Sequence, residues 1–113
     1  MWCKPTEKQL AKIPALYSGE DTPLEDKKIH MHFFLGGSDW YATEYSPKEQ
    51  IFFGFVILNG DYEMAEWGPF SFKELLDLKV SFLEVDRDRH WKVRKAKEVE
   101  KIYKAQRWEV VKK

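Results

Sequence analysis

Apolar and polar residues alternate through the middle of the chain, which is the pattern of strands that face a core on one side. Turn signals interrupt the alternation at residues 36–38 (GGS), at Pro47 and at residues 59–60 (NG). Glycine, proline and Asn-Gly are the residues that tight turns require. We therefore predict four antiparallel strands in a meander over residues 29–67.

Helical periodicity appears on both sides of this region. Thr6 with Gln9, and Ser71 with Glu74, have the spacing of capping boxes at helix starts. The segment from residue 82 to 93 alternates well enough for a fifth strand, and an amphipathic helix follows it. The predicted fold class is α+β: a four- to five-stranded antiparallel meander sheet with short N-terminal, middle and C-terminal helices.

The turn lengths predict which side chains share a face, because register in a meander follows from loop length. Loops of three, five and two residues place Leu35 opposite Asp39, Tyr45 opposite Ile51, and Leu58 opposite Asp61. One face is then a core face. The other face carries a trough with a floor of small residues (Ala42, Gly54, Ala65) and aromatic and acidic walls.

This trough is the predicted partner-binding surface, with two alternatives for what fills it. Small residues allow a helix of the same chain to approach closely, whereas tryptophan is enriched at the energetic centres of protein interfaces. The predicted partner-binding residues are Trp40, Glu44, Phe52, Glu63 and Trp67.

Two histidines two residues apart raise the question of a metal site. In the predicted register His30 and His32 share the trough face, and Glu44 lies opposite His30. Two imidazoles and a carboxylate can bind a divalent metal, or His30 and Glu44 can form an acid–base pair. The simpler interpretation is that both histidines are half-buried strand residues, one of them hydrogen-bonded to Glu44.

A charged cluster occupies residues 86–89 (DRDR). An arginine between two carboxylates can orient catalytic groups. The more ordinary interpretation is a solvated strand end that makes a structural ion pair, and we expect this pair to involve Glu66, Arg87 and Asp88. We predict no catalytic residues and no cofactor, because the chain has no nucleophile elbow and no glycine-rich phosphate loop.

Composition and charge limit the remaining choices. With 113 residues and 43% hydrophobic content the chain is long enough for one domain, and its single cysteine, Cys3, excludes an internal disulfide. No apolar run is long enough to span a bilayer and no signal peptide is recognised, so we expect a cytoplasmic protein without membrane contact.

The charge is unevenly distributed although its net value is zero. Residues 92–113 contain nine Lys or Arg against three Glu, whereas residues 1–91 contain ten against sixteen acidic residues. We predict an α+β domain over residues 1–93 and a basic helical extension over residues 94–113. Its candidate nucleic-acid contacts are Arg94, Lys95, Lys97, Lys101, Lys104 and Arg107.

Several segments resemble one family. "LAKIPALYSGEDTPLEDK", "DWYATEYSPKEQIFFGFV", "EWGPFSFKELLDL" and "VDRDRHW" are similar, in order and spacing, to the domain of unknown function 2958, over about residues 10–93. His30, His32 and the basic tail lie outside the pattern. The resemblance implies a protein carried by plasmids, phages and integrative elements, without an assigned activity. The matching residues are Tyr17, Trp40, Thr43, Glu44, Phe53, Gly54, Glu66, Gly68, Phe70, Ser71, Arg87 and Asp88.

These observations lead to one preferred function and two alternatives. We expect a small non-enzymatic interaction module that binds a protein partner through the aromatic and acidic face, and the resemblance suggests an inhibitor of a host defence system, of the anti-CRISPR or anti-restriction type. The first alternative is a nucleic-acid-binding accessory protein that uses the basic tail. The second is a metal-assisted enzyme at His30, His32 and Glu44. The oligomeric state is left open.

Overall fold

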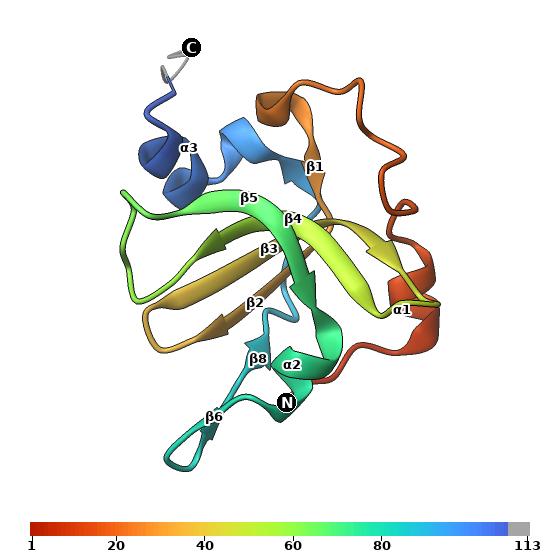
Figure 1. The fold of residues 1–113 in the computed structure, drawn as a ribbon, viewed down its shortest axis with the longest axis vertical. Helices are drawn as coiled ribbons and strands as arrows, with labels where there is room; N and C mark the ends of the chain where they lie inside the picture. Colours follow the sequence, from red (N-terminus) through yellow and green to blue (C-terminus); the bar gives the residue numbers. More distant parts are fainter. Residues whose placement is uncertain (109–113) are drawn as a thin grey trace.

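The computed structural model describes residues 1–108 and shows an α+β fold (Figure 1). Helical segments are α1 (Glu7–Ala11), α2 (Phe72–Asp77) and α3 (Glu100–Gln106), with 3-10 turns η1 (Leu24–Asp26) and η2 (Ala96–Glu98). The longer strands are β2 (Met31–Leu35), β3 (Ser38–Ser46), β4 (Ile51–Ile57) and β5 (Glu66–Ser71). Two-residue strands are β1 (Lys28–Ile29), β6 (Lys79–Val80), β7 (Leu83–Glu84), β8 (Asp86–Arg87) and β9 (Arg94–Lys95).

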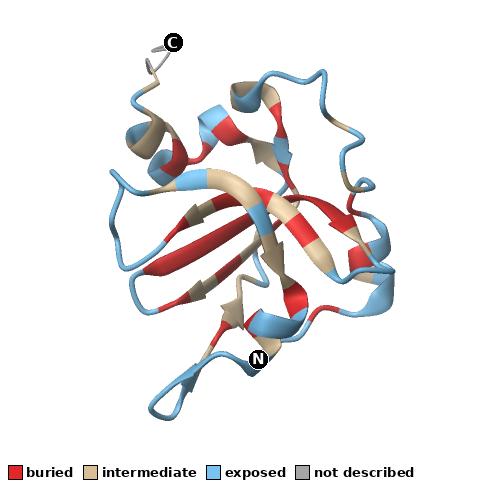
Figure 2. Cartoon of the chain, viewed as in Figure 1, coloured by how far each residue is buried: buried red, intermediate tan, exposed pale blue. Residues whose placement is uncertain are grey.

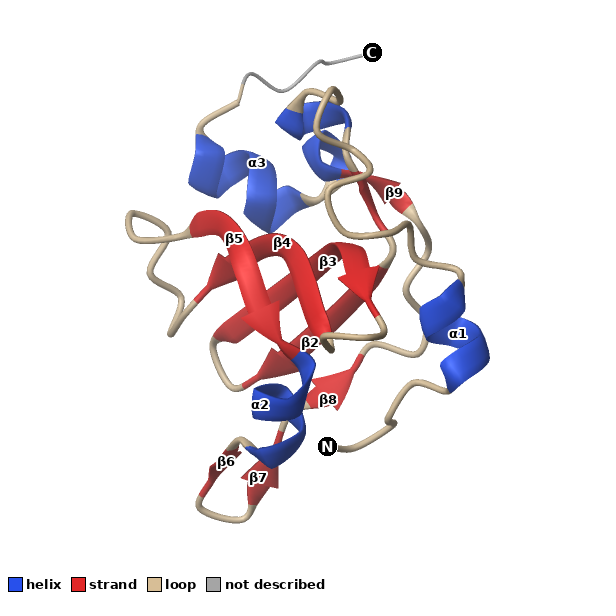
Figure 3. Ribbon diagram, turned by 45° about the vertical axis from the view of Figure 1, so that its right-hand side comes forward, coloured by secondary structure: helices blue, strands red, loops and turns tan. Residues whose placement is uncertain are grey.

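The main sheet has five strands in the order β5-β4-β3-β2-β8, and all its pairs are antiparallel. The predicted fold class is therefore confirmed. The N-terminal and middle helices begin as predicted: Thr6 and Gln9 form a reciprocal capping box at α1, and the Ser71 hydroxyl accepts a hydrogen bond from the backbone N–H of Glu74 at α2. Figure 3 shows α2 directly after the end of β5.

The first turn is one residue shorter than predicted. The side chains of β2 therefore lie on the opposite face relative to those of β3 from the one that was predicted. Leu35 pairs with Ser38, which leaves only Gly36 and Gly37 in the loop. Gly36 takes a φ of +57°, so the two glycines suffice for the turn. Ser38 joins β3, and its hydroxyl accepts a hydrogen bond from the N–H of Asn59. Phe33 consequently lies beside Trp40 instead of on the opposite face.

The second turn is also shorter by one residue, but a β-bulge compensates for it. Ser46 pairs with Ile51, and the register then shifts between Ala42 and Glu44, at Thr43. A bulge adds one residue to one strand, so beyond it Trp40 pairs with Val56 and Ala42 with Gly54, as predicted.

Gly54 allows the close approach of β3 at the bulge. A Cβ atom at this position would lie 1.8 Å from the carbonyl oxygen of Tyr41. No side chain can be accommodated there without moving the backbone of one strand.

The Asn-Gly turn forms, but no hairpin follows directly from it. Asn59 and Gly60 both have positive φ, and the Asp61 N–H bonds to the Leu58 carbonyl. The Asp61 carboxylate then accepts the N–H groups of Glu63 and Met64, which turns the chain away from the sheet. β5 begins only at residue 66, and Val56 pairs with Glu66 instead of the predicted Glu63.

The chain has two apolar clusters, one on each face of the sheet. Figure 2 shows buried residues along the strands of the sheet and in the helical segments packed against it. The first cluster joins one face of the sheet to α2 and the segment around α1. Its fully buried members include Phe33, Phe52 and Val85. The second cluster joins the other face to η2 and α3, and its centre is formed by Phe55 and Ile102.

The C-terminal segment contributes directly to the second cluster. Ala96, Val99 and Ile102 are buried, and Ile102 has no exposed surface. β9 also pairs with β1. The segment that the sequence suggests is an extension therefore shares a core with the sheet as far as residue 108, and residues 109–113 of the predicted extension lie outside the described part.

Candidate partner-binding groove and buried polar sites

A groove of about 670 Å³ lies on the first face of the sheet, next to the edge strand β5. Trp40 and Val56 contribute from β3 and β4, and Gly68 and Phe70 from β5. The segment between β4 and β5 adds further lining residues, among them Met64, whose side chain is 77% exposed. α2 packs farther along this face, against Phe52 and Tyr45, and so leaves this end uncovered.

The groove combines apolar surface with negative charge. Asp61 and Glu66 line it, and none of the described residues around it is basic. Pro69 also lies in β5, where it has no N–H to offer. A proline in an edge strand discourages the addition of another strand. The groove can therefore receive an apolar side chain with a neighbouring cation more readily than an added β-strand.

The predicted trough is not formed, because three of its five residues are interior. Trp40, Glu44 and Phe52 are 6%, 3% and 0% exposed. Trp67 points to the second face, where its indole N–H donates to Gln106 Oε1 at 3.0 Å. Glu63 is exposed in the loop before β5. The shortened first turn, the bulge and the detour after Asn59 separate residues that were predicted to line one surface.

Glu44 is the anchor of the long loop that precedes the sheet. Its carboxylate accepts the backbone N–H groups of Tyr17 at 2.7 Å and Gly19 at 3.1 Å, and Lys27 Nζ lies 3.7 Å away. Lys27 is also buried and donates to the Gly19 carbonyl at 2.5 Å. Its ammonium group lies over the ring of Phe53. A buried pair with additional hydrogen bonds of this kind fixes loop geometry.

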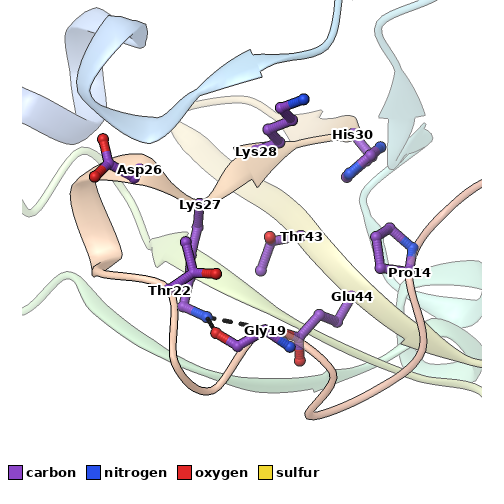
Figure 4. A pocket seen from close by; sticks show the side chains of 9 residues that line it. All are labelled: Pro14, Gly19, Thr22, Asp26, Lys27, Lys28, His30, Thr43 and Glu44. Carbon is purple, nitrogen blue, oxygen red and sulfur yellow. Dashed lines mark hydrogen bonds and ion pairs between the residues drawn. The ribbon is translucent and has the colours of Figure 1, made fainter.

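A small pocket of about 230 Å³ opens beside this pair (Figure 4). Glu44, Thr43 and His30 line it together, so the structure does bring two of the three predicted metal ligands to one cavity. Burial, and secondarily the charge of Lys28, lower the pKa of His30. The ring is therefore neutral at neutral pH.

His32 does not line this pocket and belongs to a different network. Its Nε2 atom lies 2.7 Å from Asp39 Oδ1, and Lys101 donates to Asp39 Oδ2 at 2.9 Å. The ring stacks on Tyr41. Its Nδ1 atom has no hydrogen-bond partner among the described residues and lies 3.7 Å from Asp88 Oδ2. Within residues 1–108 no three His, Cys, Asp or Glu side chains are grouped as a metal site.

Burial and neighbouring charges together shift the pKa values of two groups in this network. Burial by itself raises the pKa of Asp39, but the hydrogen bonds from His32 and Lys101 more than offset it, so the pKa lies below its usual value. For Tyr41, burial and the charge of Asp39 raise the pKa. Asp39 is therefore ionised and Tyr41 neutral at neutral pH. The Asp39–Lys101 pair joins β3 to α3.

The predicted ion pair of Glu66 with Arg87 is wrong, because the two residues lie at opposite edges of the sheet. Glu66 is in β5 and Arg87 is in β8. The Arg87 Nε atom instead donates to the carbonyl of Cys3 at 2.8 Å. Asp88 accepts the backbone N–H of His90. Arg87 thus ties the N-terminal segment to the sheet edge.

Most of the predicted nucleic-acid contacts in the C-terminal segment have carboxylate partners. Lys95 and Lys97 lie 3.8 and 3.1 Å from Asp26 Oδ1. Lys101 pairs with Asp39, and Lys104 pairs with Glu100 at 2.6 Å. Arg107 ends α3 in the left-handed conformation. Carboxylates of the body and of α3 itself therefore compensate much of the positive charge of this segment.

One comparison with known proteins gives a match. A family model described as a protein of unknown function (DUF2958) matches residues 15–106. This range continues past residue 93 and includes α3, whereas the sequence resemblance reaches only to about residue 93. Comparisons with curated proteins and with solved structures found no match.

Proposed function

The chain belongs to the DUF2958 family, and from this premise we propose that it is a non-enzymatic interaction module that binds a protein partner in the groove beside β5. The observation that carries the proposal is the composition of the groove: Leu58, Met64 and Phe70 offer apolar surface, and Asp61 and Glu66 offer negative charge. Aromatic residues and methionine are enriched at protein interfaces.

The chemistry of the groove specifies the partner. Electrostatic complementarity favours a partner that presents a positive charge, because like charges across an interface are costly. The apolar floor favours a large side chain inserted between β5 and the loop that contains Met64. We therefore propose a partner segment with an apolar anchor residue next to Lys or Arg.

The proposed biological role is inhibition of a host defence system on behalf of a mobile element. The support for this role is the resemblance to proteins carried by plasmids, phages and integrative elements. The groove gives a small protein a surface with which to bind a larger one. Residues 1–108 contain no helix long and apolar enough to cross a membrane.

The test uses two exposed positions that can change without disturbing the core. The variants Met64→Asp and Glu66→Lys remove apolar surface and reverse charge in the groove, while Phe82→Asp, at an exposed side chain outside it, is the matched control. Photo-crosslinking from position 64 and from position 82 in cell lysate should identify one partner from position 64 alone.

Binding of that partner, measured with purified proteins, should weaken at least tenfold in both groove variants and not in the control. Phage should then be plated on bacteria that carry a restriction or CRISPR system. The wild type and Phe82→Asp should protect the phage from this system and raise the number of plaques, whereas Met64→Asp should not. Equal crosslinking from both positions, or equal binding by all variants, would contradict the proposal.

A further inference from the structure

The basic residues of β1 and of residues 88–106 fall into two groups with different surroundings. In the first group a carboxylate lies close to each ammonium: Lys97 contacts Asp26 at 3.1 Å, and Lys101 contacts Asp39 at 2.9 Å. Cations that are already paired gain less from a second anion. The second group has no carboxylate within ion-pair distance among residues 1–108. Its members are Lys28, Arg89, Lys92 and Arg94, which we call the cationic strip.

The fold brings the members of the strip together from two distant segments. β1 pairs with β9, which places Ile29 beside Arg94. Farther along, the Trp91 indole N–H donates to the Ile29 carbonyl at 2.8 Å, and the Asp88 N–H donates to the His32 carbonyl at 3.0 Å. Residues 88–95 therefore run beside residues 28–32.

The side chains of the strip are available to a ligand. Lys28, Arg89 and Lys92 are exposed, and the intervening His90 is exposed as well. Asp88 is the acidic side chain of this segment, and one of its oxygens already accepts the N–H of His90.

Arg94 gives the strip a planar element. Its guanidinium lies 3.8 Å from the centroid of the Trp91 ring. Trp91 in turn packs against the second apolar cluster and the His32 ring, which holds it in place. A guanidinium supported in this way has a second face that can stack on a base.

We propose that the cationic strip binds single-stranded nucleic acid, with phosphates at Lys28, Arg89 and Lys92 and one unstacked base on Arg94. Unpaired bases favour this assignment over a duplex, because the bases of a duplex have no exposed faces for a guanidinium to stack on. The inference is independent of the partner-binding groove, which lies at the opposite edge of the sheet. It also differs from the sequence prediction, which placed the contacts along the C-terminal helix and shares only Arg94 with the strip.

The experiment measures binding of a fluorescently labelled oligothymidylate by anisotropy, with the full chain and across a salt series. For single strands, the logarithm of the binding constant should fall with the logarithm of the salt concentration with a slope of roughly −0.7 for each phosphate contacted. Three phosphate contacts therefore give a slope of about −2. The triple variant Lys28→Glu, Arg89→Glu, Lys92→Glu should bind at least about tenfold more weakly and show almost no salt dependence.

The matched control is Lys8→Glu, Lys12→Glu, Lys48→Glu. It makes the same change of net charge at three exposed lysines of α1, its C-cap and the β3–β4 turn. It should retain most of the binding and the salt slope. An equal loss in both triple variants would show that net charge alone governs binding and would overturn the assignment.

The variant Arg94→Lys separates base stacking from charge. It should weaken oligothymidylate binding about fivefold and leave the salt slope unchanged, because lysine keeps the charge but lacks the plane. The proposal is overturned if Arg94→Lys binds like the wild type while polyphosphate competes as well as the oligonucleotide, which would indicate a general polyanion surface. It is equally overturned if the wild type binds only phosphatidylserine vesicles, or binds no oligonucleotide at low salt.

Discussion

Replacement of Ile102 by alanine is expected to destabilise the whole protein. Ile102 has no exposed surface and packs in one cluster with Phe55 and Ile57 of the sheet. Truncation of a fully buried Ile or Leu typically costs 2–5 kcal/mol, through lost transfer free energy and the cavity that remains. Because alanine favours the helix and leaves its backbone intact, we expect about 3 kcal/mol.

Urea unfolding followed by tryptophan fluorescence measures this loss. For a domain of this size, 3 kcal/mol corresponds to a midpoint shift of roughly 2 M urea. Lys104→Ala is the matched control, because it lies on the exposed side of the same helix; its midpoint should remain unchanged.

The alternative is that residues 94–113 form a separate extension on a domain that folds without them. In that case Ile102→Ala would change the free energy of unfolding by less than about 0.5 kcal/mol, as surface substitutions do. Deletion of residues 94–113 would also leave a cooperative unfolding transition. Either result would refute the reasoning. We expect the deletion instead to abolish cooperative unfolding, because it uncovers Phe55 and Ile57.

Three further predictions concern single sites. Gly54→Ala should reduce stability by about 3 kcal/mol in urea unfolding, because its Cβ would meet the Tyr41 carbonyl; an unchanged midpoint would show that the bulge relaxes freely. Glu44→Gln should lower the free energy of unfolding by about 3 kcal/mol, because Lys27 is then left buried without its carboxylate. The double variant Glu44→Gln, Lys27→Met should lower the free energy of unfolding by less, because it buries no unpaired charge. Asp39 has a lowered pKa in the folded state, so its stabilising effect is complete above its unfolded pKa and disappears as the pH falls through the folded pKa. Asp39→Asn should therefore be less stable than the wild type near neutral pH, and it should lose less stability than the wild type on acidification to about pH 3. Urea titrations at each pH measure both effects.

Local signals in the sequence predict the elements well because they act over a few residues. Thr6 with Gln9 starts α1 and Ser71 starts α2, since the capping hydroxyls need only the next turn of chain. Asn59 and Gly60 adopt the left-handed conformations that their sequence favours. The pairs Trp40–Val56 and Ala42–Gly54 are also as predicted, although two deviations, a shorter turn and a bulge, cancel to produce them.

The candidate site is predicted less well because a face depends on the exact number of residues in each turn. A change of one residue in the turn at Gly36 moves His32 from the side of Ala42 to the side of Tyr41. The periodicity of apolar residues cannot reveal this, since both faces of this sheet are covered and both therefore carry apolar side chains. Charge patterning had the same limit, because the partners of Lys97 and Lys101 lie far away in sequence.

A sequence signal for the groove does exist in the segment EWGPF, residues 66–70. Glycine and proline are disfavoured inside strands, so their presence in β5 marks an edge position where the face is incompletely filled. Gly68 leaves space above Gly54, its partner in β4, and neither residue contributes a side chain. The groove therefore owes part of its space to Gly68, which lines it without a side chain. A substitution at Gly68, where a Cβ meets no atom within 4 Å, would fill the groove without straining the fold. Gly68→Leu should thus abolish partner binding while the urea midpoint stays close to that of the wild type, and retained binding in this variant would place the partner elsewhere.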